Sequence, residues 1–314
     1  MLATKFLYGN PGHYVDVTKV ASQQLHDIGY IYTSDRLLSP VTETNNKGQL
    51  LVINSDNSHY IVEAGQVLRA DDQPTTFKLK CYYHIFCNNN PVVLDIVDEQ
   101  LKIIMSSPLY NRFDSINCCV TGNYQPHYNA VINKIQQLAD GRLRIHKAVF
   151  GDTSYERFTL YAIRDDPDLT DNTFILYLHS KGVTKLDKRS GEAELIGKWR
   201  KCMMHFLLTK GEKCLEALLD KTKQYDTVGI LYVPGDGVIN KDGPIYGGNF
   251  WWTRGSYIKR CFDVSPIIGD YYWAPEHFIF NCNPNFCCLY QHWNWWKINE
   301  QFDPKHYLHL YPEV

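Results

Sequence analysis

The 314-residue sequence has almost no net charge and lacks a long apolar run. Its 32 Lys and Arg residues are balanced by 34 Asp and Glu residues, whereas nucleic-acid-binding proteins normally carry a clear basic excess. No window reaches the roughly 18 apolar residues of a membrane-spanning helix, and the first residues hold no apolar stretch typical of a signal peptide. We therefore expect no nucleic-acid partner, no membrane span and a cytoplasmic location.

The sequence also lacks the cysteine spacing of a metal site, although it contains ten cysteines. Cys118 and Cys119 lie in an apolar run, and Cys282 with Cys287 and Cys288 does not form paired C-x-x-C motifs. Structural disulfides are uncommon in proteins that are not secreted. Reduced and mostly buried thiols are therefore a better prediction than a zinc site or a disulfide framework.

Two blocks differ in their patterns along the chain. Residues 1–75 contain short β-prone runs separated by turn-forming clusters, which predicts a small β-rich module. The runs are Lys5–Tyr8, Tyr14–Thr18, Gln49–Ile53 and Tyr60–Glu63. The polar stretch Asp71–Pro74 is a candidate linker to a larger domain over residues 78–314.

From residue 78 onward, apolar strand patterns alternate with helical ones. The expected strands are 81–86, 116–121, 142–150 and 173–179, and the expected helices are 94–105, 124–138 and 155–163. This alternation predicts an α/β fold with a mostly parallel, Rossmann-like sheet flanked by helices. Such sheets bind ligands at the carboxyl ends of their strands, so a nucleotide site is expected there.

A small cationic turn follows the fourth strand of this series. His179 and Lys181 stand at the end of an apolar strand, and Gly182 allows the backbone to turn. An ammonium group at this place can hold a phosphate, with a charge-assisted contact worth roughly 1.5–3 kcal/mol. The alternative is a solvated basic helix with no ligand, which we favour for Lys188, Arg189 and Lys198 but not for His179 and Lys181.

Metal-dependent enzymes with this strand–helix layout carry an Asp-x-Asp motif at the same place. Its carboxylates hold a divalent ion on the diphosphate of a bound ligand. The acidic stretch Asp165–Asp168 precedes the strand, so we expect it at the opposite edge of the sheet as a solvated loop. Asp236 lies in a glycine-rich turn and is a weak metal candidate. We therefore predict that no metal is required, with Mn²⁺ or Mg²⁺ left open.

A glycine- and tryptophan-rich segment follows later in the chain. Gly248 permits close backbone approach, and Asn249 offers both a donor and an acceptor for sugar hydroxyls. Trp251 and Trp252 are adjacent and should point to opposite faces of a strand, one into the core and one toward the ligand. Arg254 is expected to bind a phosphate or to pair with an acid.

The segment Ala274–Phe278 supplies a candidate catalytic carboxylate. Pro275 suits the first turn of a helix, and the helix dipole favours the ionised form of Glu276 just inside it. An ionised Glu can take the proton of an attacking hydroxyl, which is worth typically 10²–10⁴-fold in rate. A helix-start Glu that only interacts with the dipole is the alternative.

Together these segments resemble a family of glycosyltransferases with the GT-A fold, found in bacterial polysaccharide clusters and large DNA viruses and related to rhamnan-synthesis F-type proteins. The matching pieces are His179–Gly182, Trp199-Arg200, Gly248–Arg254 and Glu276–Phe278, within residues 78–290. The resemblance implies transfer from a nucleotide-diphosphate sugar, most commonly a UDP-sugar, to a glycan or glycoprotein acceptor. It places Glu276 where an inverting enzyme has its base. A viral origin would imply a location in the host cytoplasm or the virion.

The remaining site residues are assigned on this basis. Lys181, His179 and Arg254 would bind the donor diphosphate, and His84, Phe86 and Asn88 would contact the nucleotide. The sugar and acceptor would contact Gly248, Asn249, Trp251, Trp252 and His277. Two alternatives stay open: a non-catalytic carbohydrate-binding protein on a degenerate transferase scaffold, and a nucleotidyltransferase, which would normally need a basic glycine-rich loop near its first strand.

Overall fold

The structure is a computed structural model. It describes residues 3–10, 13–19, 21–22, 30–32, 49–54, 59–62, 66–69, 74–152, 154–184, 191–220, 222–235, 243–264, 274–291 and 302–311. Asp236, the candidate metal ligand, lies outside these residues. The chain divides into two compact units, one of residues 1–78 with 220–223 and one of residues 79–219 with 224–314.

The first unit contains two small sheets of antiparallel strands. One sheet has the order β2-β1-β4-β5 and the other β3-β6-β7. The strands are β1 Ala3–Asn10, β2 His13–Asp16, β3 Tyr30–Tyr32, β4 Gln49–Asn54, β5 His59–Val62, β6 Gln66–Arg69 and β7 Pro74–Thr76. Phe6, Leu50 and Val52 are buried between these strands, so the unit has an apolar centre of its own.

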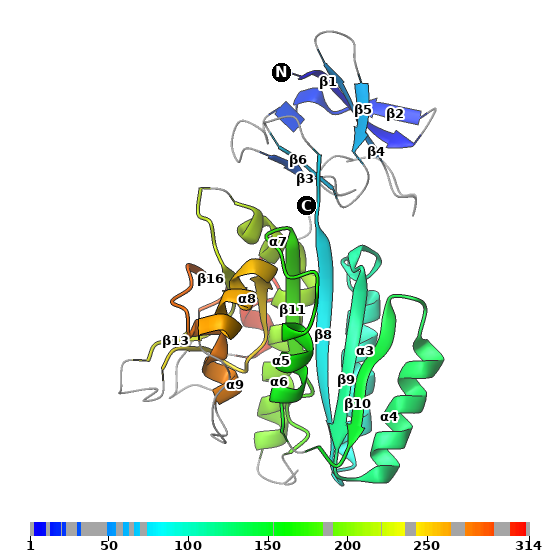
Figure 1. The fold of residues 1–314 in the computed structure, drawn as a ribbon, viewed down its shortest axis with the longest axis vertical. Coiled ribbons are helices and arrows are strands. Elements are labelled where there is room, and N and C mark those ends of the chain that lie inside the picture. Colours follow the sequence, from blue (N-terminus) through cyan, green and yellow to red (C-terminus); the bar gives the residue numbers. More distant parts are fainter. Residues whose placement is uncertain are drawn as a thin grey trace. The chain divides into compact units, whose positions relative to one another are not determined.

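The second unit is built on a seven-stranded sheet with the order β10-β9-β8-β11-β15-β12-β16 (Figure 1). Its strands are β8 Lys78–Cys87, β9 Ser115–Gly122, β10 Leu143–Phe150, β11 Thr173–His179, β12 Thr227–Gly229, β15 Trp251–Arg254 and β16 Phe286–Cys288. A separate two-stranded ribbon pairs β13 Tyr232–Val233 with β14 Ile245–Tyr246.

Strands β8, β9, β10 and β11 all run in the same direction. The pairs β8/β9 and β9/β10 are parallel. At the start of β8, Lys80 contacts Asp166 and Asp168, which precede β11. Near the end of β8, the His84 carbonyl accepts a hydrogen bond from Ser180, which follows β11. The two strands therefore start at one edge of the sheet and end at the other. Strand β15 is antiparallel to both β11 and β12, and β12 is parallel to β16. The predicted α/β fold with a mostly parallel sheet flanked by helices is confirmed.

Helices cover both faces of this sheet. Helices α5 Arg157–Arg164 and α8 Gly255–Val264 contact each other on one face (Figure 1). Helices α3 Val92–Ser106 and α4 Gln125–Leu138 contact each other on the other face. There, α6 Glu192–Met204 continues into the π-helical segment η2 His205–Thr209, followed by α7 Gly211–Leu219. The shorter helices are η1 Tyr110–Arg112, α9 Ala274–His277, η3 Phe278–Phe280 and η5 Pro304–His306.

The central strands are apolar because both of their faces are covered. Every residue of β9 is buried, and in β8 only Lys78 is exposed. Continuous apolar strands are typical of parallel sheets with helices on both sides. Strand β10 forms one edge of the sheet, and its residues are mostly half-buried or exposed. Among the described residues, no helix is long and apolar enough to cross a membrane.

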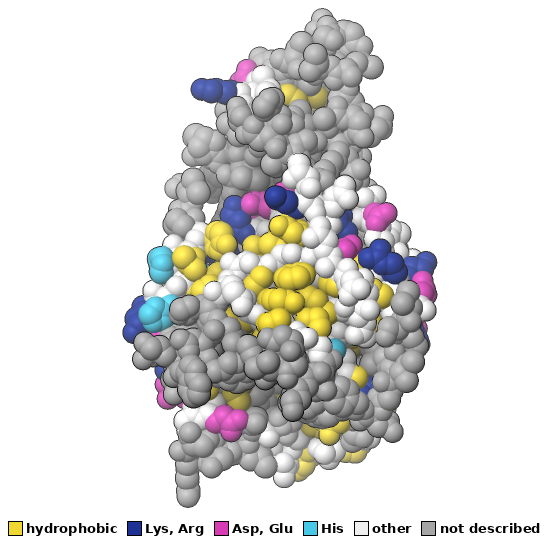
Figure 2. Space-filling model, turned by 90° about the vertical axis from the view of Figure 1, so that its left-hand side faces the viewer, with side chains coloured by type: hydrophobic (Ala, Val, Ile, Leu, Met, Phe, Trp, Pro, Cys, Tyr) yellow, Lys and Arg dark blue, Asp and Glu magenta, His cyan; other side chains and the backbone are white. Residues whose placement is uncertain are grey.

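Strand β16 forms the opposite edge. Phe286–Cys288 are half-buried there, and the Phe286 ring stacks on Tyr232 with centroids 4.4 Å apart. Figure 2 shows this side of the molecule, where hydrophobic side chains gather in the middle and charged side chains lie toward the margins.

Candidate functional site

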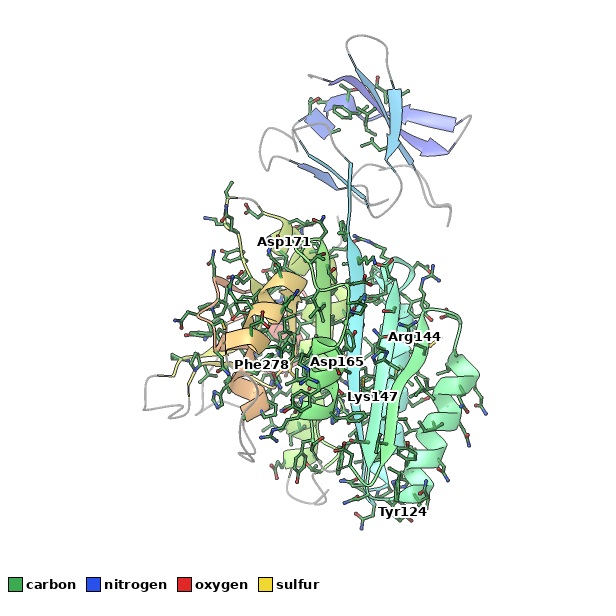
Figure 3. All side chains as sticks on the ribbon, in the orientation of Figure 1. Tyr124, Arg144, Lys147, Asp165, Asp171 and Phe278 are labelled. Atoms are coloured by element: carbon green, nitrogen blue, oxygen red, sulfur yellow. The ribbon has the colours of Figure 1, made fainter. Side chains whose placement is uncertain are left out.

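The candidate site lies at the carboxyl edge, which is the edge of the sheet where β8, β9, β10 and β11 end. In Figure 3, Tyr124, which follows β9, lies near the lower end of the sheet, whereas Asp171, which precedes β11, lies near the upper end. Because β15 is antiparallel to β11, the turn that precedes it reaches the same edge, with Tyr177 paired to Trp251. Ligand sites of parallel sheets occur at this edge.

The cationic turn after β11 is fixed by backbone and side-chain contacts. The Ser180 amide donates to His84 O at 2.9 Å, and the Ser180 hydroxyl accepts from the Phe86 amide at 3.1 Å. Gly182 adopts φ +101°, in the left-handed region that favours glycine. Arg200 donates to the Lys181 carbonyl at 3.0 Å, so helix α6 holds the turn as well.

The Lys181 ammonium lies over an aromatic surface at this turn. Its Nζ is 4.3 Å from the centroid of a ring of Trp199, which stacks on Phe302 at 5.5 Å. A cation over an indole face is stabilised electrostatically. The Lys181 side chain is half-buried, and its positive charge acts on His179, Glu156 and Glu276.

A carboxyl group that follows β10 joins three parts of the site. Glu156 immediately precedes α5, and its Oε2 accepts a hydrogen bond from Tyr177 Oη at 3.0 Å and another from Asn249 Nδ2. Its Oε1 lies 3.4 Å from His179 Nδ1, and both side chains are largely buried. Burial raises the pKa of Glu156 more than its hydrogen bonds and the nearby cations lower it.

The turn before β15 is held by His179 and Glu156. Gly248 has φ +90°, and its carbonyl accepts a hydrogen bond from His179 Nε2 at 3.0 Å. Asn249 has φ +56° and is 1% exposed; its Nδ2 donates to Glu156 and to Pro275 O at 3.4 Å, while its Oδ1 accepts from Trp251 Nε1 at 2.9 Å. The Asn249 side chain therefore holds the turn in place. The prediction that its amide contacts a sugar is wrong, because the amide is buried and bonded within the protein.

Glu276 lies in the short helix α9, within reach of the same charges. It is half-buried. Burial raises the pKa of its carboxyl, the charge of Lys181 lowers it and the charge of Glu156 raises it, leaving the pKa above its ordinary value. Glu276, Glu156 and Lys181 thus form one electrostatic group, although they are far apart in the sequence.

The two tryptophans do not form a sugar-stacking surface. As predicted, they point to opposite faces of β15: Trp251 stacks on Tyr177 at 4.8 Å, and Trp252 stacks on Phe113 at 6.0 Å and donates to Leu207 O. Both are 0% exposed. The prediction that one of them faces the ligand is wrong, because each face of this strand is covered by packed side chains.

The prediction for Arg254 is also wrong. Arg254 pairs with Phe174 at the start of β11, whereas Lys181 follows the end of that strand. Its guanidinium donates to the carbonyls of Tyr225 and Leu218 and lies over the Phe174 ring. The antiparallel direction of β15 therefore carries Arg254 to the opposite edge, away from any diphosphate held by Lys181.

The residues assigned to the nucleotide differ in their access to solvent. His84 is 3% exposed and its Nδ1 contacts Thr159 Oγ1 at 2.9 Å, so direct contact of His84 with a base is excluded by burial. Phe86 is also buried, at 9% exposed, and its ring packs near the exposed ring of Tyr155, with centroids 6.0 Å apart. Asn88 is half-buried and donates to Val183 O at 3.0 Å. His277, on α9, is 8% exposed.

The acidic stretch before β11 lies at the opposite edge, as expected, but it is not a solvated loop. Asp166 accepts from Lys80 Nζ at 2.7 and 2.8 Å and from Tyr82 Oη at 2.6 Å, and its side chain is 4% exposed. In the part of the chain that the structure describes, no group of three or more His, Cys, Asp or Glu residues could hold a metal ion.

Glu156 and Tyr177 were missed by the sequence reasoning. Tyr177 stands two residues before His179 and therefore points to the same face of β11. Glu156 follows the third strand of the parallel set and precedes its helix, where side chains reach the carboxyl edge. Attention to charged residues in the first turn of each expected helix, as well as in the loop before it, would have included Glu156 among the candidates.

Comparison with known proteins places the chain in a family. Residues 82–266, more than half of the chain, match the family described as "Domain of unknown function (DUF8361)", and the chain belongs to this family. Glu156, His179, Lys181 and Asn249 lie within the matched residues, and Glu276 lies beyond them. No curated protein matches the chain.

Among solved structures, the chain is similar to 4-diphosphocytidyl-2C-methyl-D-erythritol synthase from Anaerococcus prevotii. The two are 12% identical, and the match covers 69% of this chain and 90% of the other, with a TM-score of 0.37.

Proposed function

We propose that the protein is a glycosyltransferase that moves a sugar from a nucleotide-diphosphate donor to a hydroxyl of a glycan or glycoprotein, as in polysaccharide biosynthesis. A UDP-sugar is the favoured donor. The observation that carries the proposal is that Lys181 and Glu276 both lie at the carboxyl edge. Asn249, in the turn before β15, donates to the carbonyl of Pro275, the residue before Glu276, and the charge of Lys181 lowers the pKa of Glu276. A cation can stabilise the charge of a departing diphosphate, and a carboxylate can take the proton of an acceptor hydroxyl.

In this mechanism, Lys181 holds the diphosphate, and Asn88 lies toward the nucleotide. The acceptor oxygen attacks the anomeric carbon, and the bond from that carbon to the β-phosphate oxygen breaks. Glu276 takes the proton of the acceptor hydroxyl, and the nucleoside diphosphate leaves with its charge stabilised by Lys181. Attack from the face opposite the leaving group would invert the configuration.

The replacement Glu276→Gln tests the base. It removes the group that accepts the proton while keeping nearly the same shape, so kcat should fall by about 10²–10⁴-fold. The donor Kd should stay within about threefold, because Lys181 remains. Glu194→Gln is the matched control, since Glu194 is exposed on α6 and pairs with Lys198. Full activity of Glu276→Gln would contradict the assignment.

A donor screen by calorimetry tests the substrate class. Uridine-, guanosine- and thymidine-diphosphate sugars are titrated into the protein with EDTA or with Mn²⁺. Binding of one donor in EDTA would support metal-independent binding through Lys181, and binding only with Mn²⁺ would direct attention to Asp236. If no donor binds under either condition, the proposal fails in favour of a non-catalytic carbohydrate-binding protein.

A further inference from the structure

Glu156 has no part in the reaction steps above, yet it contacts Tyr177, His179 and Asn249 in the same site. One carboxyl oxygen accepts from Tyr177 Oη on β11 and from Asn249 Nδ2 in the turn before β15. The other oxygen lies 3.4 Å from His179 Nδ1. A single side chain therefore joins the end of β11 to the turn that faces it.

The hydrogen bond of His179 to a backbone carbonyl settles its tautomer. Nε2 lies 3.0 Å from Gly248 O, and a carbonyl oxygen has no proton to give, so Nε2 carries the hydrogen. Burial, followed by the charge of Lys181, lowers the pKa of His179 to about 3. The ring is neutral near pH 7, and its Nδ1 presents a lone pair to Glu156 Oε1.

The lone pair on His179 Nδ1 determines which protonation state of Glu156 is more favourable. If Glu156 were ionised, two lone pairs would face each other in a largely buried space, which is unfavourable. A proton on Oε1 turns the same contact into a hydrogen bond from the carboxyl to His179 Nδ1. The other oxygen of Glu156 keeps its two donors in either state.

The charged and titratable groups around Glu156 agree with this state. They are Tyr177 and His179 from β11, Lys181 from the turn after it, Arg157 from α5 and Glu276 from α9. Burial outweighs the hydrogen bonds and the two cations, so the pKa of Glu156 is raised. Two neighbouring carboxyls also resist being ionised together, and Glu276 is the one within reach of an acceptor hydroxyl in the proposed reaction.

We propose that Glu156 is the positioning residue of the site and works in its protonated form, with its O–H donated to His179 and its second oxygen bound to Tyr177 and Asn249. It fixes the Gly248-Asn249 turn against the end of β11. The two carboxyls then have separate tasks, with Glu156 neutral and structural and Glu276 ionised and reactive. Only the link to catalysis rests on the proposed function.

The replacement Glu156→Gln tests the protonation state. A glutamine amide can donate to His179 Nδ1 while its oxygen accepts from Tyr177 and Asn249, so it reproduces the protonated acid. We expect kcat and donor Kd within about threefold of the wild type and an unchanged pH profile of kcat/KM. Glu156→Ala removes all of these contacts and should lower kcat/KM by about 10- to 100-fold.

If Glu156 is instead ionised, Glu156→Gln will lose as much activity as Glu156→Ala. The acidic limb of kcat/KM will also move to lower pH, because a negative charge that raises the pKa of Glu276 has been removed. Either result overturns the proposal.

A spectroscopic test needs no substrate. Infrared spectra at pH 7 should contain the carbonyl band of a protonated carboxylic acid that shifts in D₂O, is lost in Glu156→Gln and persists in Glu276→Gln. Absence of the band, or its loss only in Glu276→Gln, would overturn the proposal. The band reports the protonation state of Glu156 even if no donor is turned over or Glu156→Ala fails to fold. Failure of the proposed glycosyltransferase function can therefore be distinguished from failure of the proposal for Glu156.

Discussion

At the scale of single residues, the charge of Lys181 should set the pH dependence of the reaction. Glu276 must lose its proton to act as a base, and its pKa is raised above the ordinary value. The acidic limb of kcat/KM should therefore lie above the pH range of an ordinary carboxyl. In Lys181→Met, loss of the charge that lowers this pKa should move the limb to still higher pH.

The same replacement should weaken donor binding. A charge-assisted contact to phosphate is worth roughly 1.5–3 kcal/mol, which corresponds to about 10- to 100-fold in Kd. Lys198→Met is the control, because Lys198 pairs with Glu194 on the exposed face of α6. If the acidic limb of kcat/KM stays in place or moves to lower pH in Lys181→Met, the electrostatic coupling between Lys181 and Glu276 is contradicted.

Gly248 provides a second test at this scale. Its φ of +90° would strain an alanine by about 1–2 kcal/mol. A Cβ there would lie 2.5 Å from Met203 Sδ, an overpacking that typically costs a further 1–3 kcal/mol. We expect Gly248→Ala to lower the free energy of unfolding in urea by about 2–5 kcal/mol and to reduce turnover, because the turn bonded to His179 shifts.

Gly141→Ala is the matched control for this replacement. Gly141 has φ +92° but no atom within 4 Å of the added Cβ, and it precedes β10 at the edge away from the site. It should show only the backbone strain and keep its activity. Equal losses of stability and activity in the two variants would argue against a tightly packed Gly248 turn.

At the scale of elements, the start of β8 is tied to the loop before β11 by a buried ion pair. Lys80 is 10% exposed and Asp166 is 4% exposed. Asp166→Asn leaves the Lys80 charge with Asp168 alone, and breaking a buried pair costs about 3 kcal/mol or more. Asp165→Asn is the control, since Asp165 is 54% exposed and its pair with Arg164 is worth less than about 1 kcal/mol.

The pH dependence of stability should differ between these two variants. Burial alone would raise the pKa of Asp166, but hydrogen bonds from Lys80 and Tyr82 outweigh it and leave the pKa lowered. A lowered folded-state pKa stabilises the protein above the ordinary carboxyl pKa, and this stabilisation is lost as the pH falls through the folded-state value. The free energy of unfolding in urea should therefore change less between pH 7 and pH 3 for Asp166→Asn than for Asp165→Asn. Equal changes with pH in the two variants would contradict this account.

The order of elements could be read from the sequence because each has a clear period. Apolar runs such as β9 and β11 become buried strands, and helical spacing from Leu94 to Met105 falls within α3. The position of His179 and Lys181 at the carboxyl edge follows from the same alternation. These inferences need only local patterns and the rule that parallel strands end at one edge.

Strand direction and burial in later elements could not be read in this way. A sequence does not show that β15 runs antiparallel to β11, and this reversal moves Arg254 to the far edge. Nor does it show that β15 is a central strand, in which Trp251 and Trp252 are both covered. Glu156 was overlooked because a single carboxylate before a helix carries no motif, and its role arises only from contacts with distant segments.

At the scale of the whole molecule, all ten cysteines are unpaired in the structure, and they differ in exposure. Seven are buried, and Cys282, Cys287 and Cys288 are half-buried near β16. Burial raises the pKa of Cys287 to about 11 and also raises that of Cys288. Since the thiolate is the reactive form, Cys287 and Cys288 should react slowly at neutral pH.

Labelling with a chromogenic disulfide reagent measures this distribution. In the native protein at most three of the ten thiols should react, faster as the pH rises, whereas unfolding in guanidinium should release the other seven. A reducing agent should leave Tm unchanged, because no cross-link holds the fold. Rapid labelling of more than three thiols would mean that the buried strands β8 and β9, which carry Cys81 and Cys119, are more open than their packing implies. A fall in Tm on reduction would mean that a disulfide is present, which would contradict the unpaired cysteines of the structure.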